Sequence, residues 1–177
     1  MATLAFEAWH DFYLALAAAA TTFTGLLFVS VSINLEHLRS QAGAQALRVA
    51  GRVFSALVVL VFIALIALIP DMDASAFAWT LLLAGAQGLL RLGWNLPNMR
   101  REAHLSAAIL PALGYLGLGA VAVLVFVRPP QALSILVAPI TLLLASAATQ
   151  AWRLLVVLRG PMQPSNAPKG KSAQTPK

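Results

Sequence analysis

The chain contains no cysteine and few charged residues. Of its 177 residues, 10% are Asp, Glu, Lys or Arg, whereas a soluble domain averages about 25%. Hydrophobic residues make up 60% of the chain, and a globule of this size could not bury them all, so lipid is the solvent that suits them. The lack of cysteine excludes disulfides, thiolate nucleophiles, cysteine-ligated zinc and iron–sulfur clusters. Composition therefore predicts an integral membrane protein.

Recognisable catalytic motifs are missing as well. The sequence has no Gly-x-Ser-x-Gly elbow, no phosphate loop, no metalloprotease helix and no pair of acids inside an apolar stretch. Its three histidines, His10, His37 and His104, show no His-x-x-x-His spacing that would hold a metal ion. We therefore expect neither an enzyme nor a bound cofactor or metal.

Five apolar stretches of suitable length to span a bilayer follow one another along the chain. An α-helix needs about 20 apolar residues to cross the ~30 Å hydrocarbon core. The stretches that meet this requirement are residues 12–34, 49–69, 76–94, 105–127 and 132–152. No alternation of polarity suggests spanning strands. We predict an all-α, polytopic transmembrane bundle over residues 1–159, with about five spans, followed by a disordered basic tail over residues 160–177.

The basic residues are distributed unevenly between the two ends of these spans. If the N-terminus is outside, eleven of the twelve Lys and Arg residues fall on the inner side, and four of the six acids fall outside. The positive-inside rule predicts this asymmetry. It explains the isoelectric point near 10.9 without nucleic-acid binding, which would need a dense basic face on a soluble scaffold. Residues 1–11 contain no Lys or Arg, which argues against a cleaved signal peptide. We predict an external N-terminus, a cytoplasmic C-terminus and no nucleic-acid partner.

Polar residues near the inner ends of the predicted spans form a candidate cluster. Its members are Asn34, Glu36, Arg52, Arg91, Asn95, Gln150 and Arg153. If they converge, they suit the binding of anionic lipid headgroups or of an acidic segment of a partner. The alternative is that each arginine extends separately to the headgroups as an anchor.

The first predicted span carries a stripe of small and polar residues. At about 100° per residue, four of them project to one side of the helix: Thr21, Thr22, Gly25 and Ser32. Such a stripe is either a packing face, because small residues let helix backbones approach closely, or the lining of a water-filled path. Pro111 and Pro139 lie inside the fourth and fifth spans, where they predict either tolerated kinks or a broken-helix binding site.

The N-terminal part of the chain resembles a known family. Residues 9–13 (W-H-D-F-Y) and 24–36 (T-G-L-L-F-V-S-V-S-I-N-L-E) are similar to the opening of a family of small bacterial integral membrane proteins that has no assigned activity. The resemblance implies a bacterial inner (plasma) membrane. Together with the small-residue faces, it favours an accessory or scaffold component that acts through contacts with lipids, a second copy or another membrane protein. The alternative is a homo-oligomeric channel or small transporter with the first span lining the path.

Overall fold

The structure, a computed structural model, consists of long helices. It describes residues 6–35, 43–100, 105–127 and 129–158. The elements are η1 (Phe6–Trp9), α1 (His10–Ile33), α3 (Ala44–Ala67), α4 (Ala74–Arg100), α5 (Leu105–Val127) and α6 (Pro129–Leu158). Within the described ranges, five helices are long and apolar enough to cross a membrane. The predicted all-α architecture with five candidate spans is therefore confirmed at that level.

Several helices extend beyond the apolar stretches that predicted them, whereas α5 has the predicted bounds. α3 begins at Ala44, five residues before the predicted span, and α4 continues past Trp94 to Arg100. Hydropathy indicates only the part of a helix that suits hydrocarbon, whereas backbone hydrogen bonding continues into polar surroundings. The predicted disordered tail, residues 160–177, lies outside the described residues.

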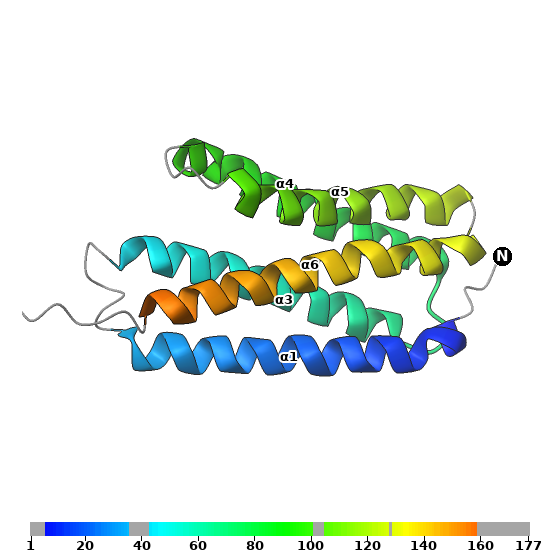
Figure 1. The fold of residues 1–177 in the computed structure, drawn as a ribbon. Helices are drawn as coiled ribbons and strands as arrows, with labels where there is room; N and C mark the ends of the chain where they lie inside the picture. Colours follow the sequence, from blue (N-terminus) through cyan, green and yellow to red (C-terminus); the bar gives the residue numbers. More distant parts are fainter. Residues whose placement is uncertain (1–5, 36–42, 101–104, 128, 159–177) are drawn as a thin grey trace, which may run out of the picture.

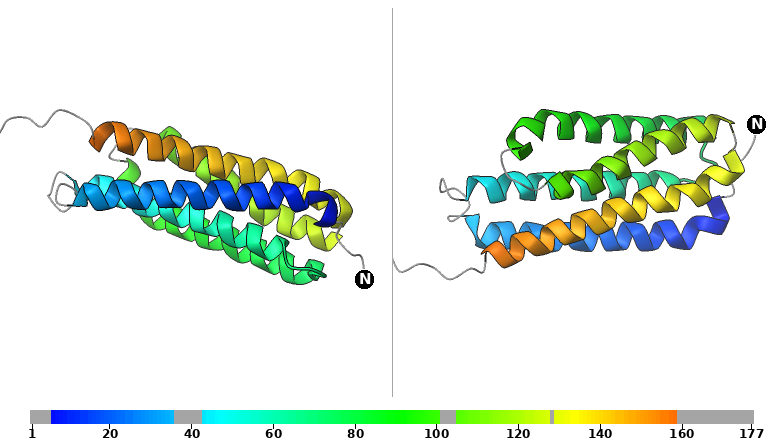
Figure 2. Two further views of the ribbon diagram at one scale, coloured as in Figure 1. Left: turned by 90° about the horizontal axis from the view of Figure 1, so that it is seen from below. Right: turned by 45° about the horizontal axis from the view of Figure 1, so that its top comes forward.

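The five long helices form two antiparallel pairs that α6 joins (Figure 1). α1 packs against α3, α4 packs against α5, and α6 contacts both α5 and α3. α3 and α4 follow each other in the chain but contact each other only sparsely. Figure 2 shows α6 running obliquely across the bundle. The two pairs are thus held together mainly through α6.

Glycines allow α4 and α5 to approach closely. A Cβ atom added at Gly85 would lie 2.9 Å from the carbonyl oxygen of Tyr115 on α5, and one added at Gly88 would overlap the Tyr115 ring. The same device joins α5 to α6, since a Cβ at Gly117 would lie 2.7 Å from Cβ of Pro139. Small residues permit such contact between helix backbones in lipid, where dispersion forces do much of the work of holding helices together.

The interior of the bundle is apolar, and so is most of its outer surface. Fully buried side chains come from all five long helices, and α6 has the largest buried share while α1 has the smallest. Large apolar side chains such as Phe28, Leu83 and Val123 are exposed along the outside. Monomeric soluble proteins rarely expose apolar patches of more than a few hundred Å². The surface therefore suits lipid.

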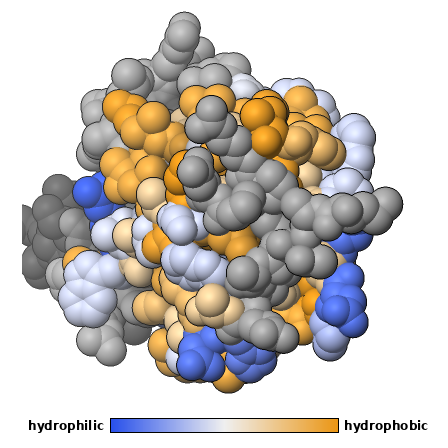
Figure 3. Space-filling model, turned by 90° about the vertical axis from the view of Figure 1, so that its right-hand side faces the viewer, coloured by the Kyte–Doolittle hydropathy of each residue, from blue (hydrophilic) through white to orange (hydrophobic). Residues whose placement is uncertain are grey.

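Charged side chains of the described residues separate to the two ends of the bundle. Arg48, Arg52, Arg91 and Arg153 lie toward the end of the bundle where α3 begins and α4 and α6 end. Asp11, Asp71 and Asp73 lie at the other end, where α1 begins and the turn joins α3 to α4. Figure 3 looks onto this acidic end, where separate hydrophilic patches lie among hydrophobic residues. The bundle thus has a basic end and an acidic end.

The turn between α3 and α4 is shaped by two aspartates. Asp71 has φ 54°, in the left-handed region that aspartate enters more readily than most residues other than glycine. Asp73 precedes α4, and its carboxylate accepts hydrogen bonds from the Ser75 hydroxyl and from backbone amides of residues 74–76. These bonds, that of Ser75 above all, hold the pKa of Asp73 below its usual value of 3.8. The charged carboxylate therefore acts as the N-terminal cap of α4.

Candidate functional site

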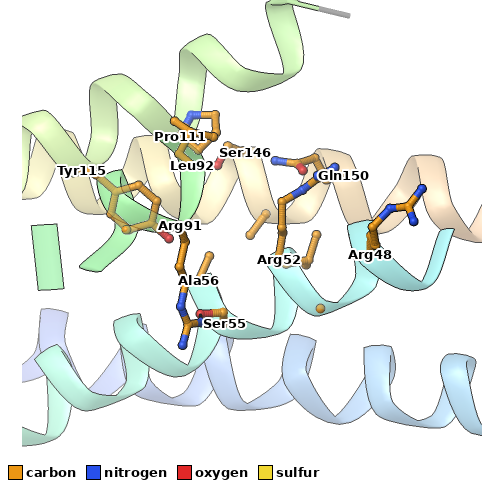
Figure 4. Close-up of a pocket in the computed structure, with 14 residues that line it drawn as sticks. Arg48, Arg52, Ser55, Ala56, Arg91, Leu92, Pro111, Tyr115, Ser146 and Gln150 are labelled. Atoms are coloured by element: carbon orange, nitrogen blue, oxygen red, sulfur yellow. Dashed lines mark hydrogen bonds between the residues drawn. The ribbon is translucent and has the colours of Figure 1, made fainter. Parts of the chain in front are cut away.

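A cavity of about 260 Å³ lies among α3, α4, α5 and α6, toward the basic end of the bundle (Figure 4). It forms where α3 and α4 leave a space between the two helix pairs, because these helices contact each other only sparsely. Pockets that enclose a whole drug-sized ligand have volumes of about 300–1,000 Å³. The cavity is therefore suited to a group smaller than a whole ligand of that size.

Three arginines line the cavity. Arg48 and Arg52 come from the first turns of α3, and Arg91 comes from α4. Arg52 is half-buried and extends toward Gln150 on α6, whereas Arg48 and Arg91 are exposed to a greater degree. No aspartate or glutamate is among the described residues that line the cavity. The described lining therefore has a formal charge of +3.

One arginine links the two helix pairs across the cavity. The guanidinium of Arg91 on α4 donates a hydrogen bond to the hydroxyl of Ser55 on α3 (Figure 4). Ser55 lies on the same face of α3 as Arg52, three residues earlier, because residues at this spacing share one side of a helix. The bond thus joins α3 and α4, two helices that otherwise contact each other only sparsely.

The remaining polar lining is neutral. Tyr115 from α5, Ser146 and Gln150 from α6, together with Ser55, provide hydroxyl and amide groups. The Ser146 hydroxyl donates to the carbonyl oxygen of Leu143 at 2.9 Å, so that donor is already used within α6. Tyrosine, serine and glutamine side chains can each donate a hydrogen bond to an oxygen atom of a ligand. The site can bind and orient a negatively charged group, and its described lining offers no acid–base pair for catalysis.

The two prolines inside helices do not interrupt them. α5 is helical through Pro111, which lines the cavity, and α6 is helical through Pro139, which is packed against Gly117. Each proline lacks the amide that would bond the carbonyl four residues earlier. Near Pro139, the Thr141 hydroxyl donates within α6 to the carbonyl oxygens of Val137 and Ala138, at 2.8 and 3.0 Å. Neither helix contains the unwound segment that a broken-helix site requires.

The structure brings together some members of the predicted polar cluster. Arg52, Arg91 and Gln150 line the same cavity. Asn34 is not part of the lining. It is the residue that follows the last residue of α1, and its side-chain amide donates a hydrogen bond to the carbonyl oxygen of Ser30 at 2.9 Å. Arg153 is exposed on α6 and is not part of the lining. Glu36 and the side chain of Asn95 lie outside the described residues.

The predicted stripe of the first span lies on the surface of the bundle. Thr21, Thr22, Gly25 and Ser32 are all exposed on α1. A Cβ atom added at Gly25 would meet no atom within 4 Å, and the Thr22 hydroxyl donates to the carbonyl of Ala18 at 2.8 Å. The stripe therefore faces the surroundings of a single chain rather than another of its helices.

Four cavity residues with polar or charged side chains were not among the sequence-based candidates: Arg48, Ser55, Tyr115 and Ser146. The spacing of residues in the sequence could have indicated two of these, Arg48 and Ser55. Arg48, Arg52 and Ser55 are separated by four and three residues, which places them on one face of a helix. Spacing gives no such indication for Tyr115 and Ser146, since only the packing of α5 and α6 against α3 and α4 brings them to the cavity.

Fold and cavity together define a class, a five-helix bundle with the dimensions of a multi-pass membrane protein and an arginine-lined cavity toward one end. Comparison with protein-family models, with curated proteins and with solved structures finds no match to the chain. Within the described part of the chain, no group of three or more His, Asp or Glu side chains is placed to hold a metal ion. The cavity is therefore the feature of the described residues that bears most directly on function.

Proposed function

We propose that the chain is a multi-pass protein of a bacterial inner membrane, with its N-terminus outside and its basic end in the cytoplasm. The separation of arginines and aspartates to opposite ends supports this orientation under the positive-inside rule. Tryptophans support the position of the bilayer: Trp79 lies near one end of α4, Trp94 near the other, and both are exposed. Tryptophan side chains favour the headgroup level of a bilayer.

Reporter fusions test the orientation. A fluorescent protein fused after Lys177 should be active in the cytoplasm, and alkaline phosphatase at the same position should be inactive because it folds only in the periplasm. The same pair fused into the turn at Met72, between α3 and α4, should give the opposite result. An active phosphatase after Lys177 would contradict the proposed number of crossings or their direction.

The function that the cavity supports best is non-enzymatic binding of an anionic lipid in the cytoplasmic leaflet, as an accessory or scaffold component of the membrane. The observation that carries it is the presence of three guanidinium groups in one cavity with no acid in its described lining. Placing an arginine at the centre of a bilayer raises the free energy of insertion by roughly 2.5–3.5 kcal/mol. The increase is smaller where the side chain extends to the headgroups. Anionic headgroups are attracted to basic pockets between helices on the cytoplasmic side.

Lipid retention tests this function. The full chain is reconstituted in phosphatidylcholine containing an anionic lipid and is then solubilised, and bound lipid is counted by native mass spectrometry. Arg52→Gln together with Arg91→Gln should lower retention of the anionic lipid at least about tenfold, the loss expected for removing charge-assisted hydrogen bonds. Arg153→Gln is the matched control, since Arg153 lies at the same end but outside the cavity. Equal loss in both variants would indicate general charge attraction and contradict a specific site.

A second candidate, a homo-oligomeric channel or small transporter, is favoured by one observation. The stripe of Thr21, Thr22, Gly25 and Ser32 is exposed on α1, the least buried of the long helices, where several copies would bring such faces together. This function expects an oligomer by native mass measurement and solute flux in liposomes that falls in a Thr21→Leu variant. A strictly monomeric chain without flux would exclude it.

A further inference from the structure

We infer that the arginine-lined cavity recognises a phosphomonoester, a terminal phosphate group that carries close to two negative charges. This inference rests on the proposed function of the same cavity and specifies the ligand. Arg48, Arg52 and Arg91 give the described lining three positive charges. A phosphodiester carries one negative charge, whereas a phosphomonoester carries about −1.5 to −2 at pH 7. The monoester therefore neutralises more of the charge in the cavity.

The donor groups that line the cavity are of the kinds that bind the terminal oxygens of a phosphomonoester. Guanidinium groups bind phosphate through two parallel N–H donors in a planar fork, and here they come from two different helices, α3 and α4. Ser55 accepts a bond from Arg91, which leaves its own hydroxyl hydrogen available to donate. A terminal phosphate offers three strong acceptor oxygens, whereas a diester offers only two non-bridging ones.

The position and size of the cavity fit a small headgroup. Its volume of about 260 Å³ lies between helices of a bundle whose outer surface is apolar, so the acyl chains of a lipid could remain in the bilayer while the phosphate enters. A free phosphomonoester from the cytoplasm would have the same chemistry at its phosphate. The experiment below separates these two sources.

The titration of the ligand provides a test that does not depend on any substitution. The titratable groups of the described lining are Arg48 and Arg52 from α3, Arg91 from α4 and Tyr115 from α5, and α6 contributes none. Arginine and tyrosine ordinarily titrate near pH 10 or above. The second proton of a phosphomonoester dissociates near pH 6. Binding of a phosphomonoester should therefore strengthen as the pH rises from 5 to 7.5, whereas binding of a phosphodiester should change little.

The experiment measures binding of two lipids to the full chain in phosphatidylcholine nanodiscs at pH 5 and pH 7.5. Phosphatidic acid supplies the monoester, and phosphatidylglycerol supplies a diester. We expect phosphatidic acid to bind about tenfold more tightly than phosphatidylglycerol at pH 7.5, as one further charge-assisted hydrogen bond would give, and this preference to disappear at pH 5. Arg52→Gln should remove the preference, and Arg153→Gln should retain it. Retained helicity by circular dichroism confirms that each variant is folded, and the pH comparison on the unsubstituted chain stands even where a variant fails.

The outcomes distinguish this inference from the function on which it rests. Equal, arginine-dependent binding of both lipids would overturn selection of a phosphomonoester and leave anionic-lipid binding in place. Binding of neither lipid, or binding that no cavity arginine affects, would overturn both. Added inorganic phosphate identifies the source. Competition at low millimolar phosphate supports a soluble phosphomonoester, and lack of competition while phosphatidic acid binds supports the lipid.

Discussion

Replacing Gly88 with alanine should weaken the packing of α4 against α5 by about 1–3 kcal/mol, the usual range for overpacking. The added Cβ atom would overlap Cγ, Cδ1 and Cε1 of the Tyr115 ring. Carbon atoms in contact lie about 3.5–4.0 Å apart, so the ring would have to move by roughly 1 Å or more. Tyr115 is only 8% exposed, but it borders the cavity, so part of the strain can be relieved by a shift of its ring. We therefore expect a destabilisation within this range rather than loss of the fold.

Gly93→Ala in the same helix is the matched control, since a Cβ atom there would meet nothing within 4 Å. Alanine in place of a helical glycine stabilises by roughly 0.5–1 kcal/mol, so the two variants should differ by about 1.5–4 kcal/mol. Reversible unfolding in mixed dodecyl sulfate micelles, followed by tryptophan fluorescence, measures the free energy of unfolding. In a Tyr115→Ala background, Gly88→Ala should lose most of its effect, because the overlapping ring is gone. Equal stability of the two single variants would refute the close contact of α4 with α5.

Three further predictions concern the turn, the core and the outer surface. The pKa of Asp73 is lower in the folded chain than in the unfolded chain, so its carboxylate stabilises the fold fully above about pH 4. This stabilisation is lost as the pH falls through the pKa that Asp73 has in the folded chain. Between pH 6 and pH 3, the unfolding midpoint should therefore fall more for the unsubstituted chain than for Asp73→Asn. Leu118→Ala, at a fully buried position, should lower the free energy of unfolding by about 2 kcal/mol. This is the low end of the range for core positions, because lipid rather than water solvates the side chain after unfolding. Leu116→Ala, at an exposed position nearby, should lower it much less in the same assay. Thr22→Val should change the free energy of unfolding by less than about 0.5 kcal/mol, since its hydroxyl bonds only within α1, and a larger loss would indicate a contact with a second copy.

The positions of the helices were predictable because the length of an apolar stretch is a local property of the chain. The predicted span 105–127 has the same bounds as α5, Leu105–Val127. The start of α3 at Ala44 and the end of α4 at Arg100 were not predictable in this way, since polar residues there carry no hydropathy signal for a span. The sequence also did not indicate which helices pack against each other. Glycines such as Gly114 and Gly117 suit close packing of helices, but only the structure places Gly117 against Pro139 of α6.

The cavity was predictable in part for a similar reason. Charge and spacing along α3 indicated that Arg52 lies at the inner end of a span, and its neighbours at helical spacing could have been added. The prediction that Arg153 and Asn34 belong with Arg52 treated the inner ends of all spans as one site. Helix rotation decides which side chains enter a shared cavity, and rotation follows from packing, which a single sequence does not specify. Gln150 and Arg153, three residues apart on α6, illustrate this, because only Gln150 lines the cavity.

The joining role of α6 has a consequence for biogenesis. The ribosome makes α1, α3, α4 and α5 before it reaches α6, so each antiparallel pair can associate while the helix that connects the pairs is still absent. A nascent chain that stops before Pro129 would therefore hold two hairpins that are joined by the turn between α3 and α4 but lack the contacts of α6. The arginine-lined cavity would be complete only when α6 has packed against α3 and α5, because α6 supplies Ser146, Ala147 and Gln150 of its lining.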